Sequence, residues 1–161
     1  MIDDEVFGTP DKVALARRGA AIRSLLKDSP RYSYYGRLVV LCDPREDVAD
    51  ILSALAKLQG AGVCHFFPRD SVDALYAELT NRGYSTDRHE QFMGGEEALE
   101  VSRQVLATHD MPEGLIVSRV DDATPRDVLA QVAEISFAFG VLPVPGAIMR
   151  GGVVPGLCLV A

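Results

Sequence analysis

Residues 38–67, LVVLCDPREDVADILSALAKLQGAGVCHFF, decide the predicted fold. The stretch opens and closes with short apolar runs, at 38–42 and 63–67, and Gly or Pro bounds each of them. Such runs suit strands that are buried on both faces. Between them, apolar residues recur at a spacing that lines one face of a helix ending at Gly60-Ala61-Gly62; they are Val48, Ile51, Leu52, Leu55 and Leu58. The stretch therefore predicts a strand–helix–strand unit with a right-handed crossover.

Four further signals mark helix starts on either side of this unit and within it. Each has a proline, followed one or two residues later by an acid: Thr9-Pro10-Asp11, Asp43-Pro44-Arg45-Glu46, Phe67-Pro68-Arg69-Asp70 and Thr124-Pro125-Arg126-Asp127. Proline suits the first helical position, an acid suits the positive helix end, and Thr9, Asp43 and Thr124 can cap. We expect the first start to open a helix over about 10–28, and the other three to open helices that end at about residues 59, 81 and 138. A fifth helix, which opens with two glutamates, is expected over 96–108.

The remaining segments complete an alternating pattern. We expect an exposed or edge strand over 84–92, strands over 115–120 and 157–161, and a loop rich in Pro and Gly over 141–156 with one turn at 147–150. The predicted fold class is α/β or α+β, with helices packed on a mixed β-sheet. The predicted organisation is an N-terminal helix and basic segment at 1–37, an α/β accessory domain at 38–110, and a further domain that begins at 115–161. That last run stops inside a strand, so we expect a piece of a longer protein; the alternative is a full-length protein whose final strand is fixed in a sheet.

Composition narrows the classes of function. The 161 residues carry a net charge of −7, which disfavours binding to a phosphate backbone, and no apolar stretch is long enough to span a membrane. Residues 12–37 nevertheless carry +6 together with Tyr32, Tyr34 and Tyr35. This segment could stack on and neutralise a nucleotide, but we favour a basic helix that docks on an acidic body. An odd number of cysteines in apolar surroundings predicts a cytoplasmic protein with reduced thiols.

No motif for a metal or a catalytic nucleophile is present. Cys64 and His65 are consecutive, so in a strand they face opposite sides, and no pair of His or Cys has the spacing of a zinc site. Cys42 and Cys64 are instead expected to be small core residues of neighbouring strands. The best loop for a phosphate, residues 91–96, leads into Glu96 and Glu97, whose charges oppose an anion, so we interpret it as a turn and helix cap. We predict no metal site.

The loop at 141–156 holds the candidate substrate residues. Glycine allows close backbone approach, proline stiffens the chain, and arginine supplies one charge. The candidates are Pro145, Gly146, Arg150, Gly151 and Gly152. A substrate-shaping loop and a plain connection both fit this pattern, because loops of such length are often functional.

One family resemblance rests on residues 115–161. LIVSRV at 115–120, then DDATPRD at 121–127 and the helix at 128–135, resembles the opening strand, bend and first helix of GNAT-type N-acetyltransferases. The following loop and residues 155–161 are similar to that family's second-helix region and second strand. The resemblance implies a GNAT-like arrangement of strands and helices, and ferredoxin-like strand–helix–strand units are the alternative.

Residues 38–92 also resemble the later part of that fold, but the family's functional residues do not carry over. Aligning on Gly83-Tyr84 puts Leu79, and not Tyr76, at the position where the family often has a tyrosine acid. The family's loop for acetyl-CoA, Q/R-x-x-G-x-G/A, fails at its last position at 91–96 and also at 59–64. The resemblance therefore implies no cofactor in this chain, with acetyl-CoA bound only by a longer protein, and leaves the catalytic residues unknown.

The leading hypothesis is the N-terminal region of an acyl-CoA-dependent N-acetyltransferase that is not catalytically competent by itself. Its partners would be an amine or another small molecule and, as an open alternative, a second copy in a homodimer, with no nucleic acid and no membrane. A different hypothesis is a non-catalytic α/β module that binds a small molecule or another protein through the 141–156 loop or the basic helix. A vicinal-oxygen-chelate-like domain is a third hypothesis, which the lack of spaced His and Glu ligands disfavours.

Overall fold

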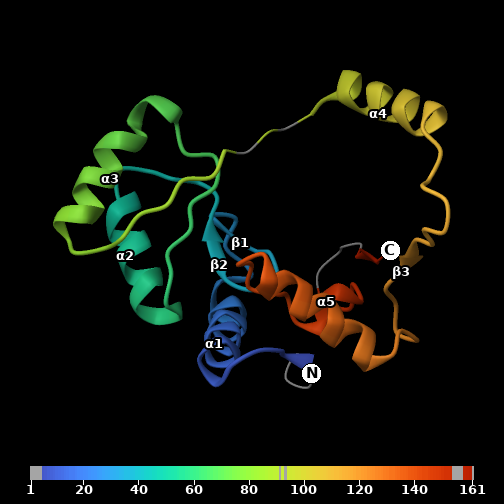
Figure 1. The fold of residues 1–161 in the computed structure, drawn as a ribbon. Coiled ribbons are helices and arrows are strands. Elements are labelled where there is room, and N and C mark those ends of the chain that lie inside the picture. The colour runs from blue at the N-terminus through green and yellow to red at the C-terminus, as the bar shows by residue number, and fades with distance from the viewer. Residues whose placement is uncertain (1–4, 91, 93, 154–157, 161) are drawn as a thin grey trace.

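Helices dominate the mixed α+β fold of the chain (Figure 1). The structure, a computed structural model, describes residues 5–90, 92, 94–153 and 158–160. Its helices are α1 (Pro10–Leu26), α2 (Val48–Gln59), the short 3₁₀ helix η2 (Arg69–Ser71), α3 (Val72–Asn81), α4 (Glu96–Thr108), α5 (Arg126–Ala138) and α6 (Gly146–Met149). Its strands are β1 (Tyr32–Tyr34), β2 (Val39–Leu41), β3 (Ser118–Arg119) and β4 (Leu159–Val160).

Helix α1 begins where the sequence predicts, with Pro10 in its first turn. The expected cap is wrong, because the side chain of Thr9 makes no capping hydrogen bond. The helix buries Ala16, Gly19 and Ile22. A Cβ atom on Gly19 would lie 2.2 Å from the backbone oxygen of Arg37. The small residues on this face thus let α1 lie directly against the β1–β2 turn.

Strand β2 is the centre of the first half of the fold. It pairs with β1 in antiparallel fashion, with Tyr34 opposite Val39. On its other side Leu41 forms an isolated parallel bridge with Cys64, so the second strand of the predicted strand–helix–strand unit is reduced to this single bridge. The expected strand over 63–67 is wrong beyond that bridge, because Phe66 has a φ of 60°, which ends extended pairing.

The apolar stripe predicted on α2 packs largely as expected. Val48, Leu52 and Leu55 are buried, while Leu58 is exposed. They form two adjoining clusters with side chains from the strands, α1 and α3: Leu41, Val48, Ala49, Leu52, Leu75 and Leu79 in one, and Ile22, Val39 and Leu55 in the other. This half of the chain therefore has a core of its own.

A second core lies around α5. Strands β3 and β4 pair antiparallel, with Ser118 opposite Val160. Buried Val120, Leu129 and Met149 form the cluster, and Phe7 from the start of the chain packs on it. The strand predicted over 115–120 covers only Ser118–Arg119, and residues 157 and 161 of the last predicted strand lie outside the described residues.

Three predicted helix starts are displaced. Helix α2 begins at Val48 and not at Pro44, and α3 follows a 3₁₀ turn that begins at Arg69. Helix α5 begins at Arg126, one residue after the predicted Pro125, and Thr124 does not cap it; the Thr124 hydroxyl accepts a hydrogen bond from the backbone N–H of Asp121 at 2.9 Å.

The segment between the two cores differs most from prediction. Within 84–92 the described residues form no strand, because most of them are exposed and no partner strand lies beside them. Helix α4 forms over the predicted range, but it lies apart from the rest of the molecule and none of its residues is buried (Figure 1). No helix among the described residues is long and apolar enough to cross a membrane.

Candidate functional site

The predicted substrate loop forms a short, ordered turn of helix. Pro145 is fully buried and precedes α6, and its backbone oxygen accepts hydrogen bonds from the N–H groups of Ile148 and Met149. Gly151 ends the helix with a φ of 74°, a conformation that favours glycine. The N–H of Gly152 donates to the oxygen of Ala147 at 3.1 Å. The five predicted residues therefore lie together around one helical turn.

The arginine of this loop holds a carboxylate from the chain itself. Arg150 donates from Nε to Glu5 Oε2 at 3.0 Å and from Nη2 to Glu5 Oε1 at 2.8 Å. Its third nitrogen, Nη1, donates to the backbone oxygen of Asp121. The Arg150 side chain is only 13% exposed and that of Glu5 19%. Hydrogen bonds from Arg150 lower the pKa of Glu5 below its ordinary value of 4.5.

Gly146 makes room for this ion pair. A Cβ atom at Gly146 would lie 2.3 Å from Glu5 Oε2, so a larger residue would push the carboxylate away. Arg150 is thus able to bind an anion, and the carboxylate of Glu5 already takes this position beside its guanidinium. A substrate carboxylate or phosphate would have to displace Glu5, and the assignment of Pro145, Gly146, Arg150, Gly151 and Gly152 to substrate binding stays a prediction.

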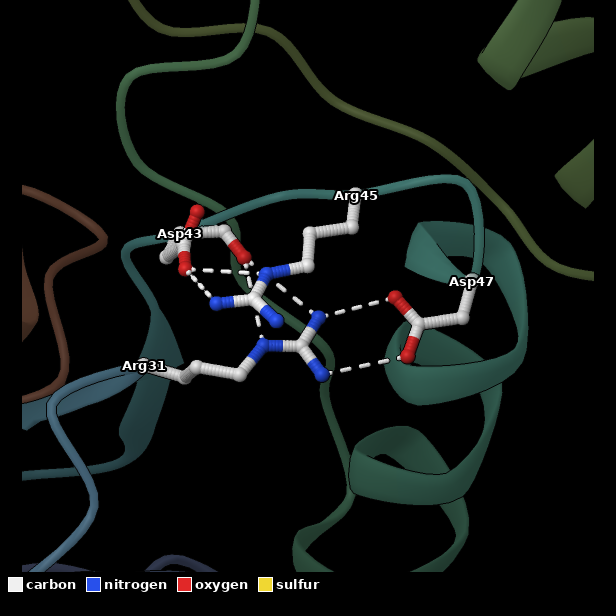
Figure 2. Close-up of polar contacts among 4 residues, drawn as sticks. All are labelled: Arg31, Asp43, Arg45 and Asp47. Carbon is white, nitrogen blue, oxygen red and sulfur yellow. Dashed lines mark hydrogen bonds and ion pairs between the residues drawn. The ribbon is translucent and has the colours of Figure 1, made fainter.

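A second polar cluster lies at the carboxyl end of β2, where α/β sheets often bind ligands (Figure 2). Arg31 donates two hydrogen bonds to the carboxylate of Asp47, at 2.8 and 3.1 Å, and these lower the pKa of Asp47. Arg31 also reaches the backbone oxygen of Asp43, whose carboxylate accepts from Arg45 at 2.6 Å. Each charge has an opposite partner within the cluster, so it ties β1 to the start of α2 and needs no ligand.

That cluster explains the late start of α2. The predicted cap, Asp43, directs its carboxylate to Arg45 and its backbone oxygen to Arg31 (Figure 2). Residues 43–47 are therefore held as a connection, and the helix begins one turn later than its proline indicates.

A third cluster joins the β1–β2 turn to the segment after the parallel bridge. The guanidinium of Arg37 lies 5.8 Å from the ring centre of Tyr35. The Tyr35 ring lies 6.2 Å from that of His65, which meets the ring of Phe66 edge-on at 6.0 Å. Tyr35 is 37% exposed and Phe66 59%, and the partial burial of the Tyr35 ring raises the pKa of its hydroxyl.

Arg37 is the unusual member of this ring cluster. Its Nε atom is buried without a hydrogen-bond partner, and burial lowers the pKa of the guanidinium. Leaving a buried donor unpaired costs about 1–3 kcal/mol. Phe66 adds strain, because a bulky residue with positive φ costs about 1–3 kcal/mol. An anion near Arg37 would supply a negative charge and the hydrogen-bond acceptor that its Nε atom lacks among the described residues.

The thiols and the tyrosine considered for catalysis have no activating neighbours. Burial raises the pKa of Cys64 to about 11 and raises the pKa of Cys42, so both thiols stay protonated and weakly nucleophilic at neutral pH. The Tyr76 hydroxyl donates to the backbone oxygen of Asp87 at 2.7 Å. Leu79, at the position aligned with the family's tyrosine acid, is a core residue.

Metal-ligand geometry is equally lacking in the part of the chain that the structure describes. No group of three or more His, Cys, Asp or Glu side chains there is placed to hold a metal ion. In the loop at 91–96, which the sequence predicts to be a turn and helix cap, Gly95 precedes the first residue of α4, and Gln91 and Met93 lie outside the described residues.

Sequence reasoning missed two residues that organise these sites. Glu5 gave no signal, since its partner is 145 positions away. In the sequence, Gln59 stands only as the first residue of a segment, 59–64, that does not match the acetyl-CoA loop pattern. It is fully buried, and its amide accepts from the N–H of Val39 at 2.9 Å and donates to the oxygen of Val39 at 2.8 Å. A glutamine directly before a helix-ending glycine was the available signal.

Comparison of the chain with protein-family models, with curated proteins and with solved structures gives no match. Any function therefore has to be inferred from the chain's own residues and their geometry.

Proposed function

We propose that the chain is the N-terminal region of an acyl-CoA-dependent N-acetyltransferase and is not catalytically competent by itself. The observation that carries the proposal is the pairing of β3 with β4 across α5 and α6. The order strand, helix, short helix, strand is the order that the resemblance of residues 115–161 implies. A GNAT-like fold is part of this proposal.

The chemistry of the described residues supports the proposal that this region is not catalytically competent by itself. Leu79 replaces the expected acid, the thiols of Cys42 and Cys64 are protonated, and Arg150 is paired with Glu5. The acyl donor would then be bound by residues outside this region, and the region would contribute packing and substrate contacts through the loop that carries Arg150.

Calorimetry with acetyl-CoA tests the proposal. We expect no binding heat for this chain, and we expect micromolar binding together with acetyl transfer to amines for the product of the complete gene. Coenzyme A without the acetyl group is the matched control ligand. A complete gene product that neither binds acetyl-CoA nor acetylates amines would contradict the proposed function, and micromolar binding by the present chain would contradict its incompetence.

A second candidate function, a non-catalytic module for a small planar anion, is favoured by the buried Nε atom of Arg37, which has no hydrogen-bond partner among the described residues. Tyr35 and Phe66 would offer ring faces to the ligand, and Arg37 would offer the charge, as base-stacking sites combine the two. This function needs only a ligand that is part aromatic ring and part anion, such as a nucleotide.

The ring cluster is tested with a nucleoside monophosphate, with the nucleoside and inorganic phosphate as its two halves. We expect the whole ligand to shift the NMR signals of the Tyr35 and His65 rings at lower concentration than either half. Arg37→Gln should abolish the phosphate-dependent part, whereas Arg45→Gln, which changes an exposed and already paired arginine, should leave it. Equal shifts in both variants would exclude this function.

A further inference from the structure

Helix α4 is an amphipathic helix without a partner in the part of the chain that the structure describes. Its apolar side chains share one face, yet Leu99 is 52% exposed, Val105 48% and Leu106 79%. The helix has 13 residues, a length at which isolated helices are marginal in water because most helical stability comes from packing. The helix lies away from the two cores (Figure 1). An apolar face of this kind needs a surface to cover it.

Helix α1 presents a surface that fits α4. Its outward face carries small residues, Ala14 and Ala21, and ends with Leu25, which is 83% exposed. At its start lies an open hollow of about 570 Å³. The hollow is lined by Gly8, Pro10, Val13, Ala14, Arg17 and Arg18. Small side chains let a second helix approach closely, and the hollow gives room for larger apolar side chains.

The charges of the two helices are complementary. Helix α1 carries a net charge of +3 and α4 a net charge of −2. Arg18, four positions from Ala14 and so on the same face, is exposed and forms no ion pair with the described residues. The helix docks on the body of its own chain through another face, with Ala16, Gly19 and Ile22 buried, and leaves this charge available for an acidic partner.

We propose that α4 of one copy docks on α1 of a second copy, so that the chain forms a two-fold dimer by exchanging its α4 arms. In one copy α1 and α4 lie at opposite ends of the molecule (Figure 1). In a two-fold dimer the contact forms twice, because α4 of each copy meets α1 of the other copy. Two helix contacts bring the buried area toward the roughly 800 Å² per partner of specific interfaces. The dimer goes beyond the proposed function and involves no acyl donor.

Sedimentation velocity over a concentration series tests the dimer. We expect the chain to dimerise in the micromolar range. Leu99→Glu with Leu106→Glu, and separately Ala21→Glu with Leu25→Glu, should each weaken the dimer by more than about tenfold, because charges would enter an apolar contact. Ile135→Glu, which changes an equally exposed apolar residue on α5, is the matched control and should leave the dimer intact. Circular dichroism establishes that each variant is folded.

Mixing the two double variants separates arm exchange from other dimers. Together they retain one intact contact, between α4 of one variant and α1 of the other, so we expect a weak heterodimer that neither variant forms alone. Added salt should weaken it, since exposed charges are screened. A chain that stays monomeric at high concentration would overturn the proposal. So would a dimer that the α1 changes leave intact, which would indicate pairing between α4 helices.

Discussion

At the scale of single residues, Gln59 has the clearest structural role. The backbone N–H of Leu41 donates to the oxygen of Val63, and the oxygen of Leu41 accepts from the N–H of His65. At Val39, on the same edge of β2, no described backbone group takes this place. The amide of Gln59 supplies the missing acceptor and donor there, and it also bonds to the oxygen of Ala61 at 3.0 Å. The side chain thus continues the hydrogen bonding of a neighbouring strand where that strand is absent.

Substitution Gln59→Leu tests this role. The change keeps the side chain of similar size but replaces its amide by an apolar group, which leaves the buried N–H and oxygen of Val39 unpaired, each at a cost of about 1–3 kcal/mol. We expect the free energy of unfolding to fall by about 3 kcal/mol, measured by urea denaturation. Gln131→Leu, on the exposed side of α5, is the control. Equal losses for the two variants would show that the strand edge does not depend on Gln59.

Residue identity predicted burial better than it predicted partners. The apolar spacing of α2 correctly indicated that Val48, Leu52 and Leu55 would be buried. It could not indicate that Leu58 would lie at the rim, or that Arg150 would meet Glu5. Periodicity depends only on local geometry, whereas a salt bridge between the two ends of the chain depends on how both cores pack.

At the scale of elements, helices followed the sequence closely because their hydrogen bonds are local. Both α1 and α4 begin at the predicted residue. The late start of α2 comes from Arg31, which lies outside the helix and holds the connection at Asp43 and Asp47 (Figure 2). Tertiary contacts of this kind override a local start signal, and no pattern within residues 43–47 announces them.

Strands were harder to predict because a strand exists only where a partner pairs with it. Residues 63–67 have the apolar character of a buried strand, yet pairing ends at the positive φ of Phe66. The described residues of 84–92 pair with no strand; among them, Tyr84 packs on the first core, where its hydroxyl donates to the oxygen of Ser53 at 3.3 Å. Composition predicts what a strand can bury and not which strand lies beside it.

At the scale of the whole molecule, the predicted segment 1–37 serves both cores. Ile22 belongs to the core around β2, while Phe7 packs on the core around α5. Gly36 allows close approach as well, since a Cβ atom there would lie 2.7 Å from Ile148. The division into 1–37, 38–110 and 115–161 stays a prediction, but contacts of the first segment join the other two.

Substitution Glu5→Gln tests that connection through its pH dependence. The folded state lowers the pKa of Glu5, so its pairing with Arg150 stabilises the fold fully above the ordinary value of 4.5 and is lost as pH falls through the lower folded-state value. We expect the urea midpoint of the variant to lie below that of the original chain at neutral pH, and the two to converge in acid.

Glu134→Gln, at an exposed position on α5, is the control and should show no such convergence. A gap between Glu5→Gln and the original chain that stays constant down to strongly acidic pH would mean that the Glu5 carboxylate does not stabilise the fold through its charge.

The pairing of Glu5 with Arg150 also sets an order of events during synthesis. The two residues are separated by 145 positions, so Glu5 leaves the ribosome long before its partner exists. At ordinary elongation rates the delay is on the order of ten seconds. Throughout that interval α1, β1, β2 and α2 can assemble around Leu41, while the segment carrying Glu5 and Phe7 waits. Glu5 and Phe7 are thus made before the first core and reach their place after it has formed.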